Sequence, residues 1–362
     1  MKNNSDCNAP SKVFNNPTID IITPIWNGGR WVGQYMHNLL SQTYQNYKIF
    51  FVDDQSTDGT YEVLKETEKK YPDKVIVLQV PVNGGQGKAR DFALDSGLVT
   101  ADYLLCLDID DIQEPEFLET LIRTAVEYDV DMVMCGLDCF DDKTGQVIST
   151  QLTTCPEEVV RNIKDFHEIA YMNPAVWNKL YRREVIKDYR YGNAKDVEDG
   201  IYLMRVLPSI KSIKFVNKVL FHYRIGNQSA LARLTGEKFK DRWSYYTELS
   251  AYINSHSEIY KDYMDIFELQ TFIKCGMGLT HRVAFKDMKH MNRYVKYSKK
   301  KLDELIPGWR KNRYLQIRNT FGSDIKEKAV AVCALLYKIN CFEVFIVLYW
   351  LYKKMSKKDI RW

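Results

Sequence analysis

The chain has 362 residues, enough for one large core with an appendage or for two domains. Its composition, 45% hydrophobic and 27% charged, is typical of a soluble protein. The formal net charge is +4, but residues 1–235 carry 26 basic and 33 acidic side chains whereas residues 236–362 carry 25 and 14. The basic region indicates an anionic partner. Lipid headgroups or a phosphate-linked acceptor fit better than nucleic acid, because no motif combines basic with stacking aromatic residues; a solvated, highly charged helical surface is the alternative.

The eight cysteines form no Cys-x-x-Cys pair and show no regular spacing. Cys135 and Cys139 are four residues apart, but no second pair of Cys or His completes a zinc site. This pattern predicts free thiols in a reducing cytosol, and hence a cytoplasmic protein. Residues 1–17 are polar and lack the apolar segment of a signal peptide, so we expect a flexible N-terminus.

Strand and helix patterns alternate through the first part of the chain. We expect strands at residues 19–23, 47–52, 75–80, 103–107 and 132–136, and helices at residues 31–43, 61–70, 88–96 and 116–127. This alternation predicts an α/β fold with a mostly parallel sheet that is flanked by helices.

The pattern changes beyond residue 157. We expect a helix at 157–169, an extended segment at 175–181, a helix at 199–207 and a strand at 213–223, and only helices beyond residue 236. The apolar run 344–352 is too short to span a bilayer, but its Trp and Tyr and the lysines after it would suit a membrane interface. A core helix of the C-terminal region is the alternative.

Three carboxylates, Asp108, Asp110 and Asp111, follow the apolar run at residues 104–107. Open α/β sheets bind ligands at the carboxyl edge of their strands, which is where these acids would lie. An Asp-x-Asp pair offers hard oxygen ligands to Mg²⁺ or Mn²⁺, and the cation would in turn hold a phosphate.

Two loops after other strands carry further polar groups. The second expected strand runs into Asp53 and Asp54, where a carboxylate can accept a hydrogen bond from a nucleobase N–H or cap the following helix. The glycine-rich loop 83–87 precedes a helix with Lys88 and Arg90, so the backbone can approach a phosphate while a cation contacts a nucleotide. The loop is not G-x-G-x-x-G and follows the third strand, which argues against a dinucleotide-binding fold.

In chain order, these motifs resemble those of the family-2 glycosyltransferases of the GT-A fold, most closely bacterial enzymes that build capsule, lipopolysaccharide or other surface glycans. The matching segments are TPIWN at 23–27, LLSQT at 39–43, VDDQSTDGT at 52–60, NGG at 83–85 with Ala89-Arg90, LDIDD at 107–111 with Pro115, WNKLY at 177–181, and Glu198-Asp199. The resemblance covers residues 18–230 and fades beyond 236. It implies a GT-A domain at 18–235 and a basic α-helical region at 236–362 that binds the acceptor, a membrane surface or both.

The resemblance implies a nucleotide pocket at the strand ends. Pro24 and Trp26 would face the base or ribose; Trp26 replaces the commoner Tyr, which keeps stacking but loses the phenolic hydroxyl. Asp54 would contact a uracil ring, Arg90 would lie near the nucleobase, and Asp108 would approach the ribose or the metal.

The resemblance also implies which groups carry out the reaction. Asp110 would bind the divalent cation, Mn²⁺ or Mg²⁺, that bridges the diphosphate, and Asp111 would support it. Taken alone, Glu198 and Asp199 would only complement a helix dipole. In the family, however, Asp199 matches the catalytic base and Glu198 is its neighbour. Asp199 would accept a proton from an acceptor hydroxyl in a single displacement that inverts the anomeric carbon.

Five further residues are notable, and three of them, His222, Trp177 and Lys179, have two possible roles each. His222 is either a third metal ligand or a half-buried structural histidine, and Arg224 is a candidate phosphate contact. Trp177 and Lys179 either line the acceptor pocket or pack in the interior. Asp91 stands where the family usually has Asn, a departure that the sequence does not explain.

We therefore expect an inverting glycosyltransferase that moves a sugar from a UDP-linked donor to a glycan or lipid-linked glycan, in the cytoplasm or at the inner face of the cytoplasmic membrane. A sugar-phosphate nucleotidyltransferase would need a glycine-rich, cationic loop directly after the first strand, where residues 24–27 read Pro-Ile-Trp-Asn. A non-catalytic glycan-binding protein on the same fold would be favoured by loss of Asp110 or Asp199, and both are present.

Overall fold

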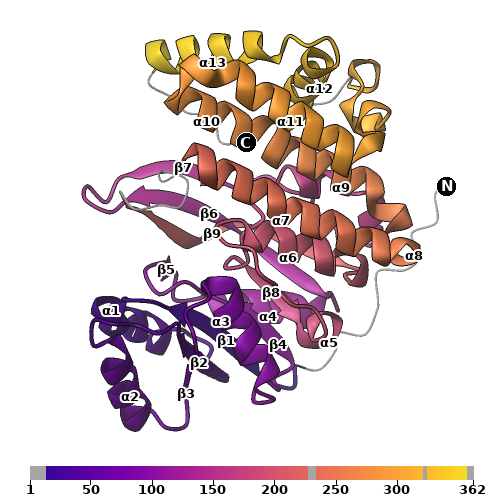
Figure 1. Ribbon diagram of the computed structural model, residues 1–362. Helices are drawn as coiled ribbons and strands as arrows, with labels where there is room; N and C mark the ends of the chain where they lie inside the picture. The colour runs from indigo at the N-terminus through magenta and orange to yellow at the C-terminus, as the bar shows by residue number, and fades with distance from the viewer. Residues whose placement is uncertain (1–13, 227–233, 321–323, 357–362) are drawn as a thin grey trace, which may run out of the picture. The chain divides into compact units, whose positions relative to one another are not determined.

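The computed structural model describes residues 14–226, 234–320 and 324–356, which divide into two compact units (Figure 1). The first unit consists of the described residues of Met1–Ile163 and Ala175–Gly226. The second consists of those of Lys164–Pro174 and Asn227–Trp362. The chain therefore leaves the first unit for eleven residues, 164–174, and returns to it. Every described strand belongs to the first unit.

One nine-stranded sheet forms the first unit, in the order β3-β2-β1-β4-β8-β6-β9-β5, with β7 paired to β6. The strands are β1 (Ile19–Ile25), β2 (Tyr47–Asp53), β3 (Val75–Gln79), β4 (Tyr103–Cys106), β5 (Ile112–Gln113), β6 (Met132–Asp141), β7 (Val147–Gln151), β8 (Lys179–Arg182) and β9 (Ile213–Ile225). The run β3-β2-β1-β4 is parallel, as is the pair β6–β9, and β8, β5 and β7 are antiparallel to their neighbours. The predicted α/β sheet is thus confirmed, with antiparallel strands added to its second half.

Four helices of ten residues or more connect strands of this sheet. They are α1 (Gly29–Leu40), α2 (Thr60–Lys70), α3 (Gln86–Asp95) and α4 (Phe117–Glu127). Strand β1 is buried at every position, as expected for a parallel strand with helices on both faces of its sheet. Helix α1 buries residues 32, 35, 36 and 39, the i, i+3, i+4, i+7 spacing of a single helical face.

The helix predicted at 157–169 is wrong. The backbone of Val160 instead exchanges hydrogen bonds of 2.9 and 2.8 Å with Ile213 of β9, and only two 3₁₀ turns follow, η1 (Ile163–Asp165) and η2 (His167–Ala170). Pairing with a sheet strand has overridden the local helical spacing of the apolar residues. The helix predicted at 199–207 is present as α6 (Glu198–Val206), after the short helix α5 (Arg183–Ile186).

All regular secondary structure in the described residues of the second unit is helical, as predicted beyond residue 236. Its helices are α7 (Gly236–Ser255), α8 (Ser257–Tyr260), α9 (Met264–Thr271), the π-helical η5 (Phe272–Leu279), α10 (Thr280–Lys286), α11 (Met291–Leu305), α12 (Ile325–Lys338) and α13 (Phe342–Ser356). Among the residues placed in the structure, no helix combines the length and the apolar character needed to cross a bilayer.

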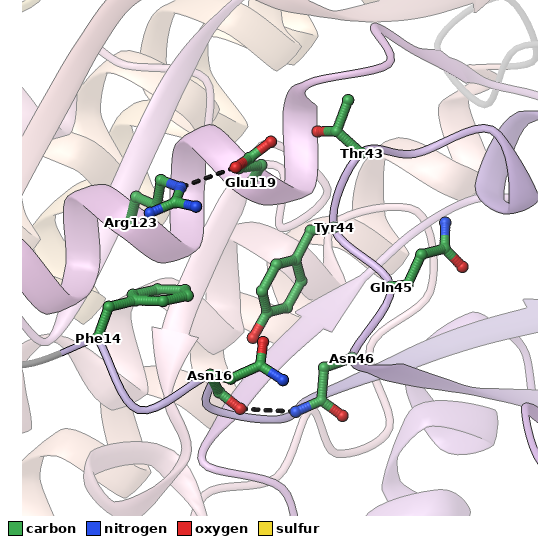
Figure 2. A pocket seen from close by; sticks show the side chains of 8 residues that line it. All are labelled: Phe14, Asn16, Thr43, Tyr44, Gln45, Asn46, Glu119 and Arg123. Atoms are coloured by element: carbon green, nitrogen blue, oxygen red, sulfur yellow. Dashed lines mark hydrogen bonds and ion pairs between the residues drawn. The ribbon is translucent and has the colours of Figure 1, made fainter.

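A hollow of about 440 Å³ lies at the amino ends of β1 and β2 (Figure 2). Its lining residues are Phe14, Asn16, Thr43, Tyr44, Gln45, Asn46, Glu119 and Arg123. Several polar groups there are paired with one another or with nearby backbone. Asn46 Nδ2 donates to Asn16 O at 2.6 Å, Arg123 Nε donates to Glu119 Oε1 at 2.8 Å, and Gln45 Nε2 donates to Gln42 O at 2.6 Å. This hollow lies at the amino ends of the parallel strands, whereas the predicted site acids follow their carboxyl ends.

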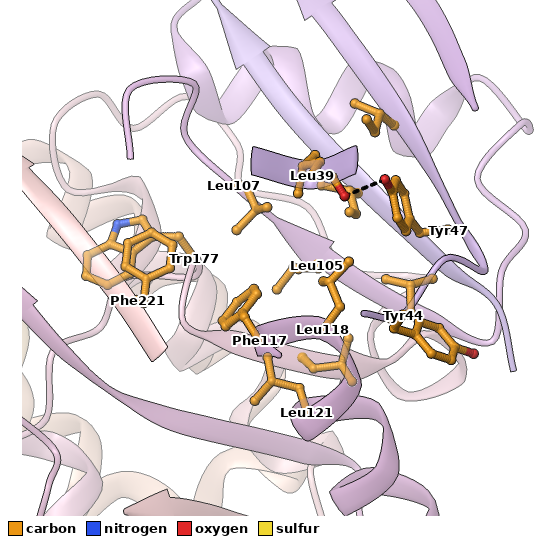
Figure 3. Packing of buried hydrophobic residues seen from close by; sticks show 14 of the residues in the cluster. Leu39, Tyr44, Tyr47, Leu105, Leu107, Phe117, Leu118, Leu121, Trp177 and Phe221 are labelled. Atoms are coloured by element: carbon orange, nitrogen blue, oxygen red, sulfur yellow. Dashed lines mark hydrogen bonds between the residues drawn. The ribbon is translucent and has the colours of Figure 1, made fainter. Parts of the chain in front are cut away.

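The core of the first unit packs helices α1 and α4 against the sheet, and Trp177 belongs to it (Figure 3). The indole is 4% exposed and stacks on Phe221 and Tyr223, with ring centroids 4.4 and 5.2 Å away. Lys179 is fully buried, and its ammonium group donates to Ala175 O and to Asn178 Oδ1. These contacts support the packing alternative for both residues, and their acceptor role stays a prediction.

Replacing Trp177 with Ala should therefore destabilise the protein by about 3–5 kcal/mol, because it leaves a large cavity in the core. Trp26→Ala is the matched control: Trp26 is 59% exposed, so its loss should change the free energy of unfolding by less than about 0.5 kcal/mol. Denaturation followed by far-UV circular dichroism measures both. A stable Trp177→Ala variant that transfers sugar poorly would instead support the acceptor role.

Candidate active site

The acids predicted at strand ends meet at one edge of the sheet. Strands β2, β1 and β4 are adjacent and parallel, with Ile25 opposite Asp53 and Ile22 opposite Cys106. The chain leaves the sheet after Leu107, whose N–H still donates to Ile22 O at 3.1 Å, so Asp108 lies at the carboxyl end of β4. On the neighbouring strand β1, Pro24 is buried, whereas Trp26, just past the strand end, exposes its ring. The edge therefore presents both carboxylates and a ring that can stack on a base.

Arg90, on helix α3, connects two of the predicted site acids. Its Nη1 lies 2.8 Å from Asp199 Oδ1, and its Nη2 lies 3.0 Å from Asp108 Oδ1. The side chain is fully buried, and its guanidinium lies 5.2 Å from the ring centroid of Tyr191. The resemblance implied a cation near the nucleobase; in the structure both terminal nitrogens face carboxylates. Arg90 thus ties α3 to the end of β4 and to the first turn of α6.

The carboxyl groups around Arg90 are crowded. The pKa of Asp108 is raised to about 6, chiefly by burial; Arg90 lowers it, and the charges of Asp199 and Asp110 raise it. The pKa of Glu198 is raised to about 7 by burial and then by the charge of Asp199. Burial also raises the pKa of Asp110 and, with the charges of Asp110 and Asp108, that of Asp111. An excess of carboxyl groups over cations makes this edge a favourable place for a bound cation.

Asp91, next to Arg90, has a role that the sequence did not reveal. Its two carboxylate oxygens accept hydrogen bonds from the backbone N–H groups of Tyr191, at 2.7 Å, and Gly192, at 2.9 Å. Tyr191 in turn stacks on Tyr202 of α6, with ring centroids 4.0 Å apart. The family's usual Asn would replace one accepting oxygen with an NH₂ donor, which cannot accept from a second N–H. The Asp therefore suits a turn that presents two donors.

The carboxylate of Asp54 holds the glycine-rich loop. Its Oδ1 accepts from Gly84 N–H at 2.8 Å and its Oδ2 accepts from Gly85 N–H at 2.7 Å. Gly85 has φ +86°, a backbone conformation that favours glycine. Asp54 therefore does not cap α2; at the start of that helix it is Asp58 that accepts from Thr60 N–H, at 3.1 Å. Contact of Asp54 with a uracil ring stays a prediction.

Arg224, on β9, holds the corner that carries Asp110 and Asp111. Its Nε donates to Asp110 O at 2.6 Å, and its backbone N–H donates to Asp111 Oδ1 at 2.9 Å. Its Nη1 pairs with Asp142 at 2.8 Å, and the guanidinium lies 4.6 Å from the ring centroid of Trp31. The predicted phosphate contact stays a prediction; the contacts present make Arg224 a positioning residue for the Asp-x-Asp-Asp segment.

The carboxylates that follow β4 are suitable ligands for a divalent cation, although they do not converge on one point in the structure. Within residues 14–226, 234–320 and 324–356, no three His, Cys, Asp or Glu side chains lie close enough together to hold a metal ion. Asp111 Oδ2, however, is buried and has no hydrogen-bond partner among the described residues. Carboxylate oxygens are the ligands that Mg²⁺ and Mn²⁺ prefer, so Asp108, Asp110 and Asp111 suit such an ion.

His222 lies between two carboxylates. Its Nδ1 is 2.8 Å from Asp138 Oδ1, and its Nε2 is 3.0 Å from Glu114 Oε1. The ring joins β9 to β6 and to the residue after β5, and both of its nitrogens have partners. These contacts support the structural interpretation, and metal binding by His222 stays a prediction.

Comparison with known proteins places the chain among glycosyltransferases. The family model described as Glycosyl transferase family 2 matches residues 20–190. The chain is 25% identical over 264 residues to the putative glycosyltransferase EpsH of Bacillus subtilis, which covers 71% of this chain and 74% of that protein. It is 30% identical over 246 residues to an uncharacterized glycosyltransferase of Nostoc sp., which covers 65% of this chain and 74% of that protein.

A solved structure agrees with these matches. The crystal structure of S. aureus TarS 1–349 in complex with UDP-GlcNAc superposes with a TM-score of 0.66 at 15% sequence identity. The match covers 95% of this chain and 93% of that one, so the likeness in fold extends over nearly the whole chain. Sequence and fold together show that the chain belongs to glycosyl transferase family 2 and is a glycosyltransferase with the GT-A fold.

Proposed function

We propose that the protein is an inverting glycosyltransferase that takes its sugar from a UDP-linked donor. The observation that carries this proposal is the bridge from Arg90 to Asp108, at the end of β4, and to Asp199, at the start of α6. It holds an acid of the Asp-x-Asp motif and the proposed base in one cluster, so one site would serve both the leaving group and the acceptor. The TarS structures with UDP and UDP-GlcNAc support the choice of donor.

Asp199 is the base in this proposal. It accepts the proton of an acceptor hydroxyl while that oxygen forms a bond to the anomeric carbon of the donor sugar. The bond from that carbon to the diphosphate oxygen breaks on the opposite side, and its electron pair leaves with the nucleoside diphosphate. One displacement therefore inverts the anomeric configuration. Arg90 engages Oδ1 of Asp199, which fixes the carboxylate and supplies a counter-charge.

Asp110, with Asp108, would hold a divalent cation, and Asp111 would support the same corner. When bound, Mn²⁺ or Mg²⁺ would supply positive charge to the departing diphosphate. Arg224, on β9, fixes the positions of Asp110 and Asp111. It donates hydrogen bonds to the backbone carbonyl of Asp110 and to one carboxylate oxygen of Asp111.

The nucleotide would lie over the ends of β1 and β2. Trp26 exposes its ring beside this edge and would stack on the base or ribose, next to Pro24. Asp54 would accept from the uracil N–H in addition to its bonds from Gly84 and Gly85, and the N–H groups at the start of α3 would approach the diphosphate. Glu198 lies beside the base on α6 and would support the acceptor hydroxyl.

For the acceptor we propose a hydroxyl of a glycan or lipid-linked glycan in the synthesis of a surface polysaccharide, such as capsule or lipopolysaccharide. The region 236–362, with 25 basic and 14 acidic side chains, suits an acceptor that carries phosphate. We place the reaction in the cytoplasm, at the inner face of the membrane where such an acceptor would be presented.

Asp199→Asn should keep UDP binding but reduce sugar transfer by about 10²–10⁴-fold, because the group that accepts the proton is lost. Asp110→Ala should instead lose the increase in UDP affinity that Mn²⁺ provides. Calorimetry with UDP, with and without Mn²⁺, and a hydrolysis screen of UDP-sugars measure the two effects. Asp73→Asn, an exposed acid between α2 and β3, is the control and should behave as wild type. Full transfer activity in Asp199→Asn would refute the base assignment.

Glu198→Gln should change how stability depends on pH. The pKa of Glu198 is raised in the folded protein from its ordinary value of 4.5 to about 7. Its contribution therefore favours folding below pH 4.5 and is lost as the pH rises toward 7, since the unfolded chain then releases the proton more easily. Glu198→Gln should thus be more stable relative to wild type at pH 8 than at pH 5.

Urea denaturation at the two pH values measures this difference. Glu62→Gln, at an exposed position on α2, is the matched control against which the difference for Glu198→Gln is measured. An equal offset for Glu198→Gln would contradict the burial of a protonated carboxyl group beside Asp199.

A further inference from the structure

Exposed apolar side chains are concentrated on the last two described helices. Of the 20 large hydrophobic side chains that are exposed in the described parts of the chain, 10 lie between residues 325 and 356. They are Ile325, Val332, Leu335, Ile339, Val344, Val347, Leu348, Leu351, Tyr352 and Met355. Single exposed apolar residues are common on soluble proteins, but a cluster of this kind marks an interaction surface.

Helix α13 is apolar on two faces. Residues 342, 346 and 349 are buried, at 0%, 0% and 6% exposure, and these pack within the second unit. Residues 344, 348, 351 and 355 are 51%, 61%, 42% and 84% exposed, and their spacing of four, three and four residues makes one stripe. A helix at the surface of a monomer normally places polar residues there. Within the described parts of the chain, no segment buries this apolar stripe.

Helix α12, which contacts α13, carries a second stripe. Val332, Leu335 and Ile339 are 44%, 42% and 55% exposed, whereas Cys333, Ala334 and Tyr337 are buried. Two neighbouring helices thus each present an apolar surface in addition to a packed one. We call these two stripes together the α12–α13 strip.

The residues that flank the strip indicate what it binds. Lys353 and Lys354 follow the α13 stripe, and the Lys354 ammonium lies 5.2 Å from the ring centroid of Trp350. The sequence has no Asp or Glu from residue 344 to residue 356, and it continues with Lys357 and Lys358. Aliphatic residues bordered by Trp, Tyr and Lys are the composition of helices that lie in the interfacial layer of a bilayer.

Charge also favours a lipid surface over a second copy of the chain. Region 236–362 has an excess of basic over acidic side chains, 25 against 14, so two copies facing each other would repel, whereas anionic headgroups would attract this region. No described helix can cross the bilayer, so the contact would be peripheral.

We propose that the α12–α13 strip docks the protein on a bilayer that contains anionic phospholipid, with the two stripes among the headgroups and upper acyl chains. This proposal rests on the lipid-linked acceptor proposed above, because docking would bring the transferase to the membrane surface where that acceptor lies. The binding itself needs no nucleotide sugar and is measured without one.

Co-sedimentation of the full chain with vesicles tests this proposal. Wild type should bind phosphatidylcholine vesicles that contain phosphatidylglycerol, and bind pure phosphatidylcholine vesicles far less. The double variant Leu348→Glu/Leu351→Glu should bind the mixed vesicles at least about tenfold more weakly, because it places two carboxylates in the apolar contact. Lys353→Gln/Lys354→Gln should weaken binding and reduce its sensitivity to salt.

The matched control is Val147→Glu/Ile148→Glu, which changes two exposed apolar residues of β7 in the first unit and should bind like wild type. Circular dichroism spectra must show that each variant is folded. Absence of wild-type binding to mixed vesicles at low salt, or equal binding by Leu348→Glu/Leu351→Glu, would overturn the proposal. So would a wild-type dimer in light scattering that this variant converts to a monomer while no form binds vesicles.

The vesicle experiment and the test of the proposed function can fail independently of each other. If wild type binds anionic vesicles but hydrolyses no UDP-sugar, the donor proposal fails and the docking surface stands. If it hydrolyses a UDP-sugar but binds no vesicle, the docking surface fails and the donor proposal stands.

Discussion

The candidate site depends on one buried guanidinium. Arg90 is fully buried, and a charge in that position is stable only when it is paired and hydrogen-bonded. Its partners, Asp108 and Asp199, come from the end of β4 and the first turn of α6, 18 and 109 residues away along the chain. Removing either acid leaves part of that charge unpaired, so the two acids and the arginine form one unit. We infer that this unit sets the distance between the end of β4, where we propose that a cation binds, and the proposed base.

The surrounding contacts hold that unit from two sides. On one side, Asp91 fixes the turn at Tyr191, whose ring lies against the Arg90 guanidinium and stacks on Tyr202 of α6. On the other side, the guanidinium of Arg224, on β9, donates a hydrogen bond to the backbone carbonyl of Asp110. The hydrogen bonds to Asp91, Asp108 and Asp199 keep these three carboxylates in place before any ligand binds. Preorganised charge of this kind is what stabilises a transition state without rearrangement.

The sequence predicted the parts of this arrangement that local patterns determine. Buried strands followed by acids identify a sheet edge, so the places of Asp108 and Asp54 followed from the alternation of strands and helices. The partners of Arg90 could not be predicted from the sequence. They depend on the packing of α3 against α6, and the spacing of apolar residues along the chain does not reveal that contact. The helix expected at 157–169 failed for a related reason: Val160 pairs with β9, a strand more than fifty residues later in the chain. The exposed strand β7 lacks the buried, alternating pattern by which strands are found.

A double-mutant cycle tests most directly whether Arg90 and Asp199 act as one unit. The turnover number for sugar transfer is measured for wild type, Arg90→Met, Asp199→Asn and the double variant, each first shown to bind UDP. If Arg90 works by positioning the base, Arg90→Met should slow wild type by at least about tenfold but slow Asp199→Asn scarcely further, a coupling of at least about 1 kcal/mol. Losses that multiply, as they do for independent residues, would contradict this account.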